Sequence, residues 1–318
     1  GLSYLYVTMG GLFALILVFI INSMLRGAGE ARFAMMVLFL TTAVTLLLQP
    51  VLIFGWGPFP QLGVAGSAWA TVLGYGSGFI LQIVVLLRGR ARIRIDLHNL
   101  KPDFPLMGRI IRIALPSTIQ MVIRSSSRLI IVGLVGVYGT FAIAAYGVAN
   151  RILMIIIIPA FGLANAAGAL VGQNLGALKP ERAERIVWWI SAYTSVYMLI
   201  SVALTFAFAQ PLMTFFDPTS QVVAMGVECI KIIAPTLLIS AIGIVLGRGF
   251  TGSGDTVPPM TVNFFTLWGM ELPFAYGLSK WLGLGIIGIW WGRAIANAAN
   301  GILFIIWFRL GNWKRRKV

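Results

Sequence analysis

The chain has 318 residues, of which 59% are hydrophobic and 10% charged; its mean hydropathy is +0.92 and its formal net charge is +15. Soluble domains carry about 25% charged residues, so this composition excludes an ordinary water-soluble fold and indicates a lipid bilayer as the solvent. The only histidine, His98, and the only cysteine, Cys229, give no basis for a metal site or an internal disulfide. We expect no cofactor.

Apolar runs long enough to cross about 30 Å of hydrocarbon follow one another along the chain. They predict nine membrane helices, at roughly 2–25, 33–55, 63–88, 106–137, 140–176, 186–210, 220–250, 257–280 and 284–310. The runs at 106–137 and 140–176 are longer than one crossing requires, and Pro116 and Pro159 are candidate kinks within them. The predicted fold class is an all-α, polytopic membrane protein.

Basic residues collect in alternate loops of this pattern. The loops on the other side of the membrane contain only one basic residue, Lys280. The positive-inside rule places the basic loops in the cytoplasm, which predicts Gly1 outside and Val318 inside, in the cell inner (plasma) membrane. Topology therefore explains the net charge, and we expect no nucleic-acid partner. The basic loop residues are Arg26, Arg32, Arg88, Arg90, Arg92, Arg94, Lys101, Arg109, Arg112, Lys179, Arg182, Arg185, Arg248, Arg309, Lys314, Arg315, Arg316 and Lys317.

An internal repeat is visible at nearly constant spacing. The segment 25–30 reads like 250–255, and 62–69 lines up with 284–291; Gln49-Pro50 lines up with Leu272-Pro273. Repeats with the same membrane orientation imply two halves related by an axis along the membrane normal.

The repeat predicts the domain organisation. The second half has six predicted helices and the first only three, so we expect about three helices to be missing before Gly1. The expected parts are a partial N-terminal lobe at 1–88, whose helices are equivalent to helices 4–6, a basic cytoplasmic linker at 89–105, and a C-terminal six-helix lobe at 106–318.

Small residues recur every four positions in two of the predicted helices. One stripe is Gly66, Ala70, Gly74 and Gly78, and the other runs from Gly168 to Gly176. Such stripes let helices approach closely in lipid, and we interpret them as packing surfaces.

Several motifs resemble signatures of the multidrug and toxic compound extrusion (MATE) family. They are LRGAGE at 25–30, LIFGWGPFP at 52–60 with LGVAG at 62–66, ALP at 114–116, and LVGQNLGA at 170–177 with KPERA at 179–183. The resemblance covers essentially the whole chain, as helices 4–12 of a twelve-helix fold. It implies a V-shaped pair of six-helix bundles that exports drugs and other organic molecules in exchange for H⁺ or Na⁺.

Two positions depart from the family pattern. Members often have Asn-x-x-x-Asp-Pro in the fifth helix, where this chain has Thr45 and Gln49 before Pro50. Some members have a glutamate in the seventh helix, where this chain has Arg124. A glutamine cannot carry a proton, and the resemblance implies that a key acidic coupling residue lies in the helices before Gly1.

Ionisable residues inside the predicted spans are the candidate functional groups, because charge in lipid is costly and usually functional. Six of them lie roughly nine to thirteen residues from the external end of their helices, or about 13–20 Å deep. We predict a substrate or ion cavity lined by Gln49, Gln120, Arg124, Arg128, Arg151, Lys231, Glu271, Arg293 and Asn297. A static salt-bridge network in the bundle fits these residues equally well.

Two ion pairs are expected in this layer, Glu228 with Lys231 and Glu271 with Arg293. The remaining basic excess favours contact with an anionic, zwitterionic or neutral substrate group over a cationic one. The competing interpretation is that the side chains of Arg124 and Arg128 reach toward the outer membrane interface and do not meet substrate.

The predicted function is secondary active export by a monomer, with a small organic substrate and membrane lipid as its partners. The alternative is a lipid or polysaccharide-lipid flippase of the same superfamily. An intramembrane enzyme is disfavoured, since the chain has no Ser/His pair and no His/Glu metal spacing. A passive channel fits two pseudo-repeated halves less well than alternating access does.

Overall fold

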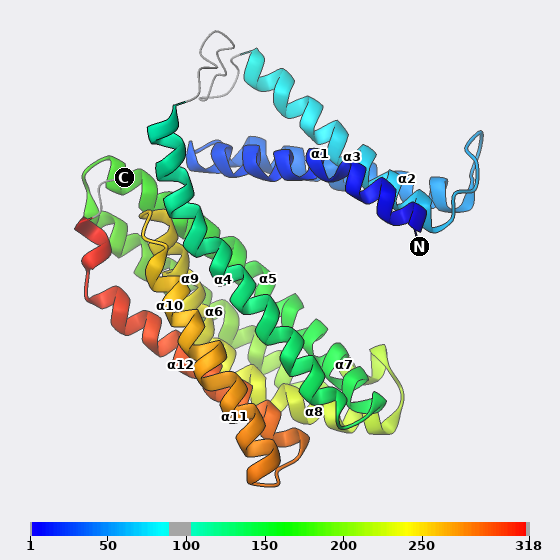
Figure 1. Ribbon diagram of the computed structural model, residues 1–318, viewed down its shortest axis with the longest axis vertical. Coiled ribbons are helices and arrows are strands. Elements are labelled where there is room, and N and C mark those ends of the chain that lie inside the picture. Colours follow the sequence, from blue (N-terminus) through cyan, green and yellow to red (C-terminus); the bar gives the residue numbers. More distant parts are fainter. Residues whose placement is uncertain (1, 89–102, 316–318) are drawn as a thin grey trace. The chain divides into compact units, whose positions relative to one another are not determined.

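The computed structural model describes residues 2–88 and 103–315, and the chain divides into two compact units, Gly1–Pro102 and Asp103–Val318. The described residues of both units are helical and contain no strand (Figure 1). Most of the linker predicted at 89–105, including His98, lies outside the described residues.

The first unit consists of α1 (Leu2–Gly27), α2 (Ala31–Phe54) and α3 (Val64–Leu87). Helix α3 packs along both others. A Cβ atom at Gly66 would meet the backbone of Leu52, and one at Gly74 or Gly78 would meet Thr45 or Thr41 of α2. The predicted small-residue stripe is therefore confirmed as the surface on which α2 approaches α3.

The second unit begins with three long helices, α4 (Phe104–Gly136), α5 (Thr140–Gly176) and α6 (Pro180–Ala207). The Asp103 carboxylate accepts a hydrogen bond from the Leu106 N–H and caps α4, while Pro180 starts α6 at a position where no N–H is needed.

Shorter segments complete the second unit. They are α7 (Ala209–Phe216), α8 (Ser220–Ile233), the 3₁₀ turn η2 (Ala234–Thr236), α9 (Leu237–Gly252), α10 (Val257–Asn263), the π-helical η3 (Phe264–Glu271), α11 (Leu272–Tyr276), the π-helical η4 (Gly277–Trp281), α12 (Ile286–Arg309) and the 3₁₀ turn η5 (Asn312–Arg315).

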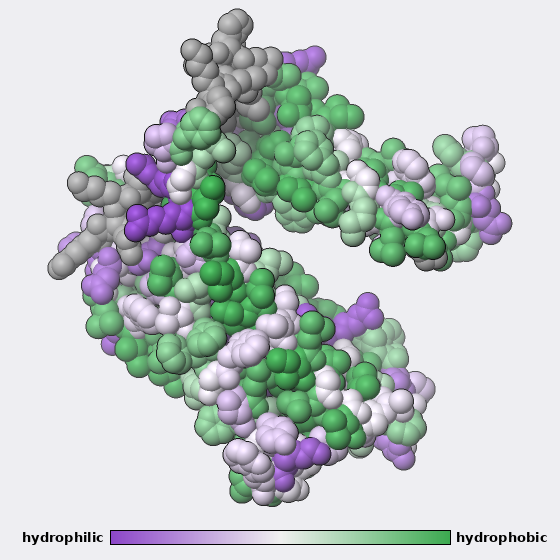
Figure 2. Space-filling model, in the orientation of Figure 1, coloured by the Kyte–Doolittle hydropathy of each residue, from purple (hydrophilic) through white to green (hydrophobic). Residues whose placement is uncertain are grey.

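Within the described residues, eight helical segments are long and apolar enough to cross a membrane. Apolar residues cover much of the outer surface along these helices (Figure 2). The protein is thus an all-α membrane protein, as predicted. The predicted span at 257–280 is helical too, but α10, η3, α11 and η4 divide it into short α and π stretches. Pro273 has no N–H to donate to the helix, and π-helical stretches often accompany functional sites.

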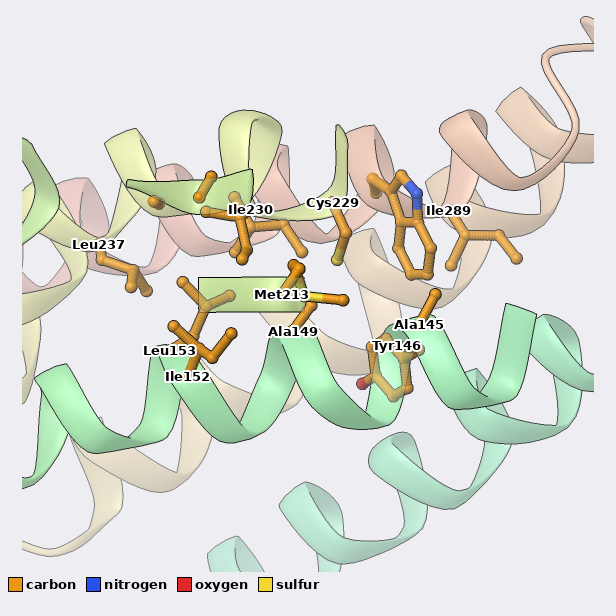
Figure 3. Close-up of a cluster of buried hydrophobic side chains, with 14 of the residues drawn as sticks. Ala145, Tyr146, Ala149, Ile152, Leu153, Met213, Cys229, Ile230, Leu237 and Ile289 are labelled. Carbon is orange, nitrogen blue, oxygen red and sulfur yellow. The ribbon is translucent and has the colours of Figure 1, made fainter. Parts of the chain in front are cut away.

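Two hydrophobic clusters form the core of the second unit. The first gathers side chains from α5, α7, α8, α9 and α12, among them Tyr146, Met213 and Cys229 (Figure 3). The second is rich in aromatic residues, including Phe250, Phe304 and Phe308. Along α12, the polar residues from Arg293 to Asn300 lie between Trp290 of the first cluster and Phe304 of the second. The fold therefore places polar side chains between two apolar layers.

Candidate functional site

A cavity of about 250 Å³ lies within the second unit. A neighbouring cavity of about 340 Å³ shares Arg124, Phe161, Ile244 and Asn300 with it, so the two adjoin. The first cavity is lined from α4, α5, α9, α10, η3 and α12 by Arg124, Ser127, Arg128, Tyr146, Asn150, Met154, Ile157, Phe161, Leu237, Ser240, Ile244, Asn263, Leu267, Glu271, Arg293, Ala296, Asn297 and Asn300.

Helical spacing brings the polar side chains to the cavity. On α4, Arg124 and Arg128 are four residues apart, and Ser127 lies on the same face. Tyr146 and Asn150 have the same spacing on α5. On α12, three polar residues recur as Arg293, Asn297 and Asn300. Each helix thus turns one polar stripe toward the cavity and keeps its apolar faces for packing.

Glu271, at the end of η3, is the only acidic residue among the described residues that line the cavity, and it is 7% exposed. The Ser127 hydroxyl donates to Glu271 Oε2 at 3.2 Å, and Arg293 Nε lies 4.0 Å from Oε1. The predicted pairing of Glu271 with Arg293 is confirmed. Charge neutralisation of this kind makes a buried carboxylate tolerable at membrane depth.

Arg293 connects α12 to α5 as well as to η3. Its guanidinium donates to the Tyr146 hydroxyl at 2.5 Å and to Asn150 Oδ1 at 3.1 Å. The Tyr146 ring stacks on Trp290, with 5.5 Å between centroids and 6° between planes. The arginine is therefore held by two helices besides its own, which fixes its position in the cavity wall.

A second polar network surrounds Asn263 at the end of α10. Arg124 Nη2 donates to Asn263 Oδ1 at 3.1 Å, and the Asn300 amide donates to the same oxygen at 3.4 Å and to the Thr266 hydroxyl at 2.9 Å. Asn297 donates to the Thr236 hydroxyl at 3.5 Å. Helices α4, α10 and α12 are thus joined through neutral amides.

Five of the predicted site residues line this cavity: Arg124, Arg128, Glu271, Arg293 and Asn297. Gln120 lines the adjoining cavity. Gln49 belongs to the first unit, where its amide donates to the Ser67 hydroxyl at 3.3 Å.

Two predicted residues do not reach the cavity. Arg151 directly follows Asn150, which turns it about 100° away from the polar stripe of α5, and its side chain is exposed. Lys231 is also exposed, with its ammonium 5.8 Å from the Phe206 ring centroid. The predicted Glu228–Lys231 ion pair is wrong. Both residues lie on α8, as their spacing predicted, but the Lys231 side chain packs beside α6.

The sequence prediction missed Ser127, Tyr146, Asn150 and Asn263 as cavity residues. These four side chains are neutral, and the prediction rested mainly on ionisable residues at a common depth, with neutral amides added only at Gln49, Gln120 and Asn297. The signal that marks two of them is an asparagine inside an apolar span, since a buried amide also requires partners in lipid. In the described residues, no group of three His, Cys, Asp or Glu side chains could hold a metal ion.

Comparisons with known proteins identify the family. A family model described as MatE matches residues 116–277, just over half of the chain. The probable multidrug resistance protein YoeA of Bacillus subtilis (strain 168) is 27% identical, over 95% of this chain and 66% of that protein. The probable multidrug resistance protein NorM of Thermotoga maritima is 29% identical, over 99% of this chain and 68% of that protein. The chain thus spans about two thirds of the length of these relatives.

A solved structure of a multidrug resistance MATE family transporter, in an outward-facing conformation, matches the fold. Its TM-score is 0.91 at 25% sequence identity, over 97% of this chain and 68% of that chain. The family model, the two relatives and the fold agree, and this membrane protein belongs to the multidrug and toxic compound extrusion (MATE) family.

Proposed function

We propose that the protein takes part in secondary active export, in which organic molecules, drugs among them, leave the cell in exchange for entering H⁺ or Na⁺. The observation that carries this proposal is the polar cavity, in which charged and amide side chains face one another inside apolar helices of membrane-spanning length. Buried charge in a membrane is costly and gathers on substrate and ion paths. The naming of YoeA and NorM as probable multidrug resistance proteins supports the same function.

The proposed mechanism is alternating access by a monomer in the plasma (inner) membrane. Repeats with the same orientation, such as 25–30 and 250–255, are typical of transporters whose halves rock around a shared site. Binding and release of substrate then require movement of the helices and no covalent chemistry, so the protein acts as a transporter and not as an enzyme.

An efflux assay tests the proposal. Cells depleted of their own exporters and supplied with the complete transporter should retain less ethidium than cells with an empty vector. A protonophore, or removal of Na⁺, should abolish the difference, and the treatment that does so identifies the coupling ion. Efflux that survives both treatments contradicts ion-coupled export. Movement of a fluorescent lipid between leaflets, without ethidium efflux, would favour the flippase alternative.

Cysteine labelling tests the proposed topology. The only cysteine of this sequence, Cys229, is buried, and Cys229→Ala removes its thiol from the background. Gln61→Cys, in the turn between α2 and α3, should then react with an impermeant thiol reagent on intact cells. Arg182→Cys, on the basic side, should react only after the membrane is opened. The reverse pattern overturns the assignment of a cytoplasmic C-terminus.

A further inference from the structure

The charge of the cavity is unbalanced. Three arginines, Arg124, Arg128 and Arg293, line it together with one acid, Glu271. That acid already receives hydrogen-bonding and electrostatic contacts from Ser127 and Arg293. Arg248 adds another basic side chain to the lining of the adjoining cavity. Within the described part of the chain, the two cavities therefore carry a basic excess.

The two arginines of α4 retain hydrogen-bonding capacity that faces the cavity. A guanidinium has five N–H donors, and Arg124 uses one side of its group for the Asn263 amide oxygen. Among the described residues, none forms a hydrogen bond or ion pair with Arg128. Because Arg124 and Arg128 are one helical turn apart, their free donors project toward a common volume.

Apolar side chains surround the rest of the same space. Met154, Ile157 and Phe161 of α5 line one wall, and Leu237 and Ile244 of α9 line another. Apolar side chains beside a guanidinium strengthen its attraction to an anion, because they screen the charges less than water does. The combination suits a ligand with one anionic group on an apolar or aromatic body.

We propose that Arg124 and Arg128 form a binding subsite for the carboxylate or phosphate of an organic anion, whose apolar part lies against Phe161 and its neighbours. Guanidinium groups bind both oxyanions through paired N–H donors. The proposal deepens the proposed export function by naming a substrate class. Its ligand chemistry has two sources, a soluble organic anion or the phosphate of a membrane lipid.

A binding measurement without transport tests the subsite. The full chain, purified into phosphatidylcholine nanodiscs, is dialysed against four probes with the same ring: 2-naphthoate, 2-naphthyl phosphate, 2-naphthylmethanol and 2-naphthylmethylammonium. We expect both anions to bind at least about tenfold more tightly than the alcohol or the cation, since charge-assisted hydrogen bonds are stronger than neutral ones. Equal affinity for the anions and the cation overturns the proposal.

Variants locate the effect. Arg128→Gln should weaken anion binding about tenfold and leave 2-naphthylmethanol binding unchanged, with little change in melting temperature because Arg128 forms no hydrogen bond or ion pair with the described residues. Arg124→Gln should weaken anion binding to a similar degree, with a lower melting temperature because it also changes the donor to Asn263. Arg151→Gln, an exposed arginine on α5 outside the cavity, is the matched control. Anion binding that survives both α4 substitutions, or that falls as far in the control, contradicts the subsite.

Replacing part of the phosphatidylcholine with phosphatidylglycerol distinguishes the two ligand sources. Competition of this lipid with 2-naphthyl phosphate in the native chain, lost in Arg128→Gln, assigns the subsite to a lipid phosphate; no competition assigns it to a soluble anion. Ion-coupled ethidium efflux together with equal binding of the anionic and cationic naphthyl probes would refute the subsite and leave export intact. Anion binding without ion-coupled efflux would refute export and leave the subsite intact.

Discussion

Buried polar side chains in the first unit differ from those that line the cavity of the second unit, although Ser191 Oγ and Trp290 Nε1, outside that lining, also lack hydrogen-bond partners. In the first unit, Asn22 and Gln82 are fully buried, yet both polar atoms of the Asn22 side chain and Gln82 Oε1 have no hydrogen-bond partner. Around the cavity of the second unit, the buried groups of Glu271 and Asn263 are both hydrogen-bonded. Charged side chains also differ in position between the units. Arg26 and Arg32 lie at helix ends in the first unit, whereas Arg293 lies between two hydrophobic clusters in the second.

The physical reason is that burying an unpaired charge costs more free energy than burying an unsatisfied neutral amide. An unsatisfied neutral amide costs about 1–3 kcal/mol, which a small helical unit can tolerate. An unpaired charge at membrane depth costs several kcal/mol, so it requires donors and acceptors from several helices at once. The second unit supplies them from α4, α5, η3 and α12. The buried charge pair Glu271 and Arg293 is thus located where several helices together supply its partners.

The largest expected effect comes from removing the centre of that network. Arg293→Leu leaves Glu271 without its cation and removes the donor to Tyr146 and Asn150, so we expect a loss of about 3–5 kcal/mol of stability. Thermal or denaturant unfolding in nanodiscs measures it. Arg151→Leu is the control, and a similar loss there would remove the distinction between networked and peripheral charge.

A charge exchange sharpens the same point. Glu271→Gln should lower stability or transport, and the double variant Glu271→Arg with Arg293→Glu should recover part of the loss if the pair acts mainly through opposite charge. A double variant as damaged as the single variants shows that Ser127 and Tyr146 matter more than the pair itself.

In the first unit we expect packing to matter more than polar contacts. A Cβ atom at Gly74 would meet the Thr45 hydroxyl and the Thr41 backbone, whereas nothing lies within 4 Å of one at Gly76 on the same helix. Gly74→Ala should therefore cost about 1–3 kcal/mol. Gly76→Ala should be neutral or stabilising by up to ~1 kcal/mol, because alanine favours the helix. Equal melting shifts for the two variants would contradict the close approach of α2 and α3.

A smaller, opposite effect is expected at Asn22. Asn22→Leu replaces two unsatisfied polar atoms with apolar surface of similar size, so it should raise stability by about 1 kcal/mol. The unfolding midpoint of the purified chain measures the change. A clear loss of stability indicates that Asn22 is satisfied in the membrane, for example by a buried water, and the contrast between the units then narrows.

The smallest effect is expected at a helix start outside the membrane spans. Asp217 Oδ1 accepts the Thr219 N–H at 2.9 Å, and this hydrogen bond lowers the pKa of the Asp217 carboxyl below its usual range. A lowered folded pKa means that the stabilisation is present above the unfolded pKa and is lost as pH falls through the folded pKa. Asp217→Ala should therefore slightly lower stability at neutral and higher pH, where the stabilisation is present, and flatten the acid side of the profile measured by unfolding across pH.

The sequence by itself determined the membrane class, the helix positions and the family. Apolar runs of membrane-spanning length predicted the spans within a few residues, because hydrophobicity is a property of each segment alone. Equal depth on consecutive helices was enough to pair Glu271 with Arg293. The stripe that includes Gly74 indicated the packing surface of α3.

Tertiary structure alone decided which polar residues meet. Depth along a helix can be counted from the sequence, but the direction of a side chain around the helix depends on the neighbours it packs against. Arg151 and Lys231 share the depth of Arg293 yet lie outside the cavity, while Asn150, one position before Arg151, lines it. Asn263 acquires its role from Arg124 and Asn300, which are distant in the chain and are brought together only by the packing of α4, α10 and α12.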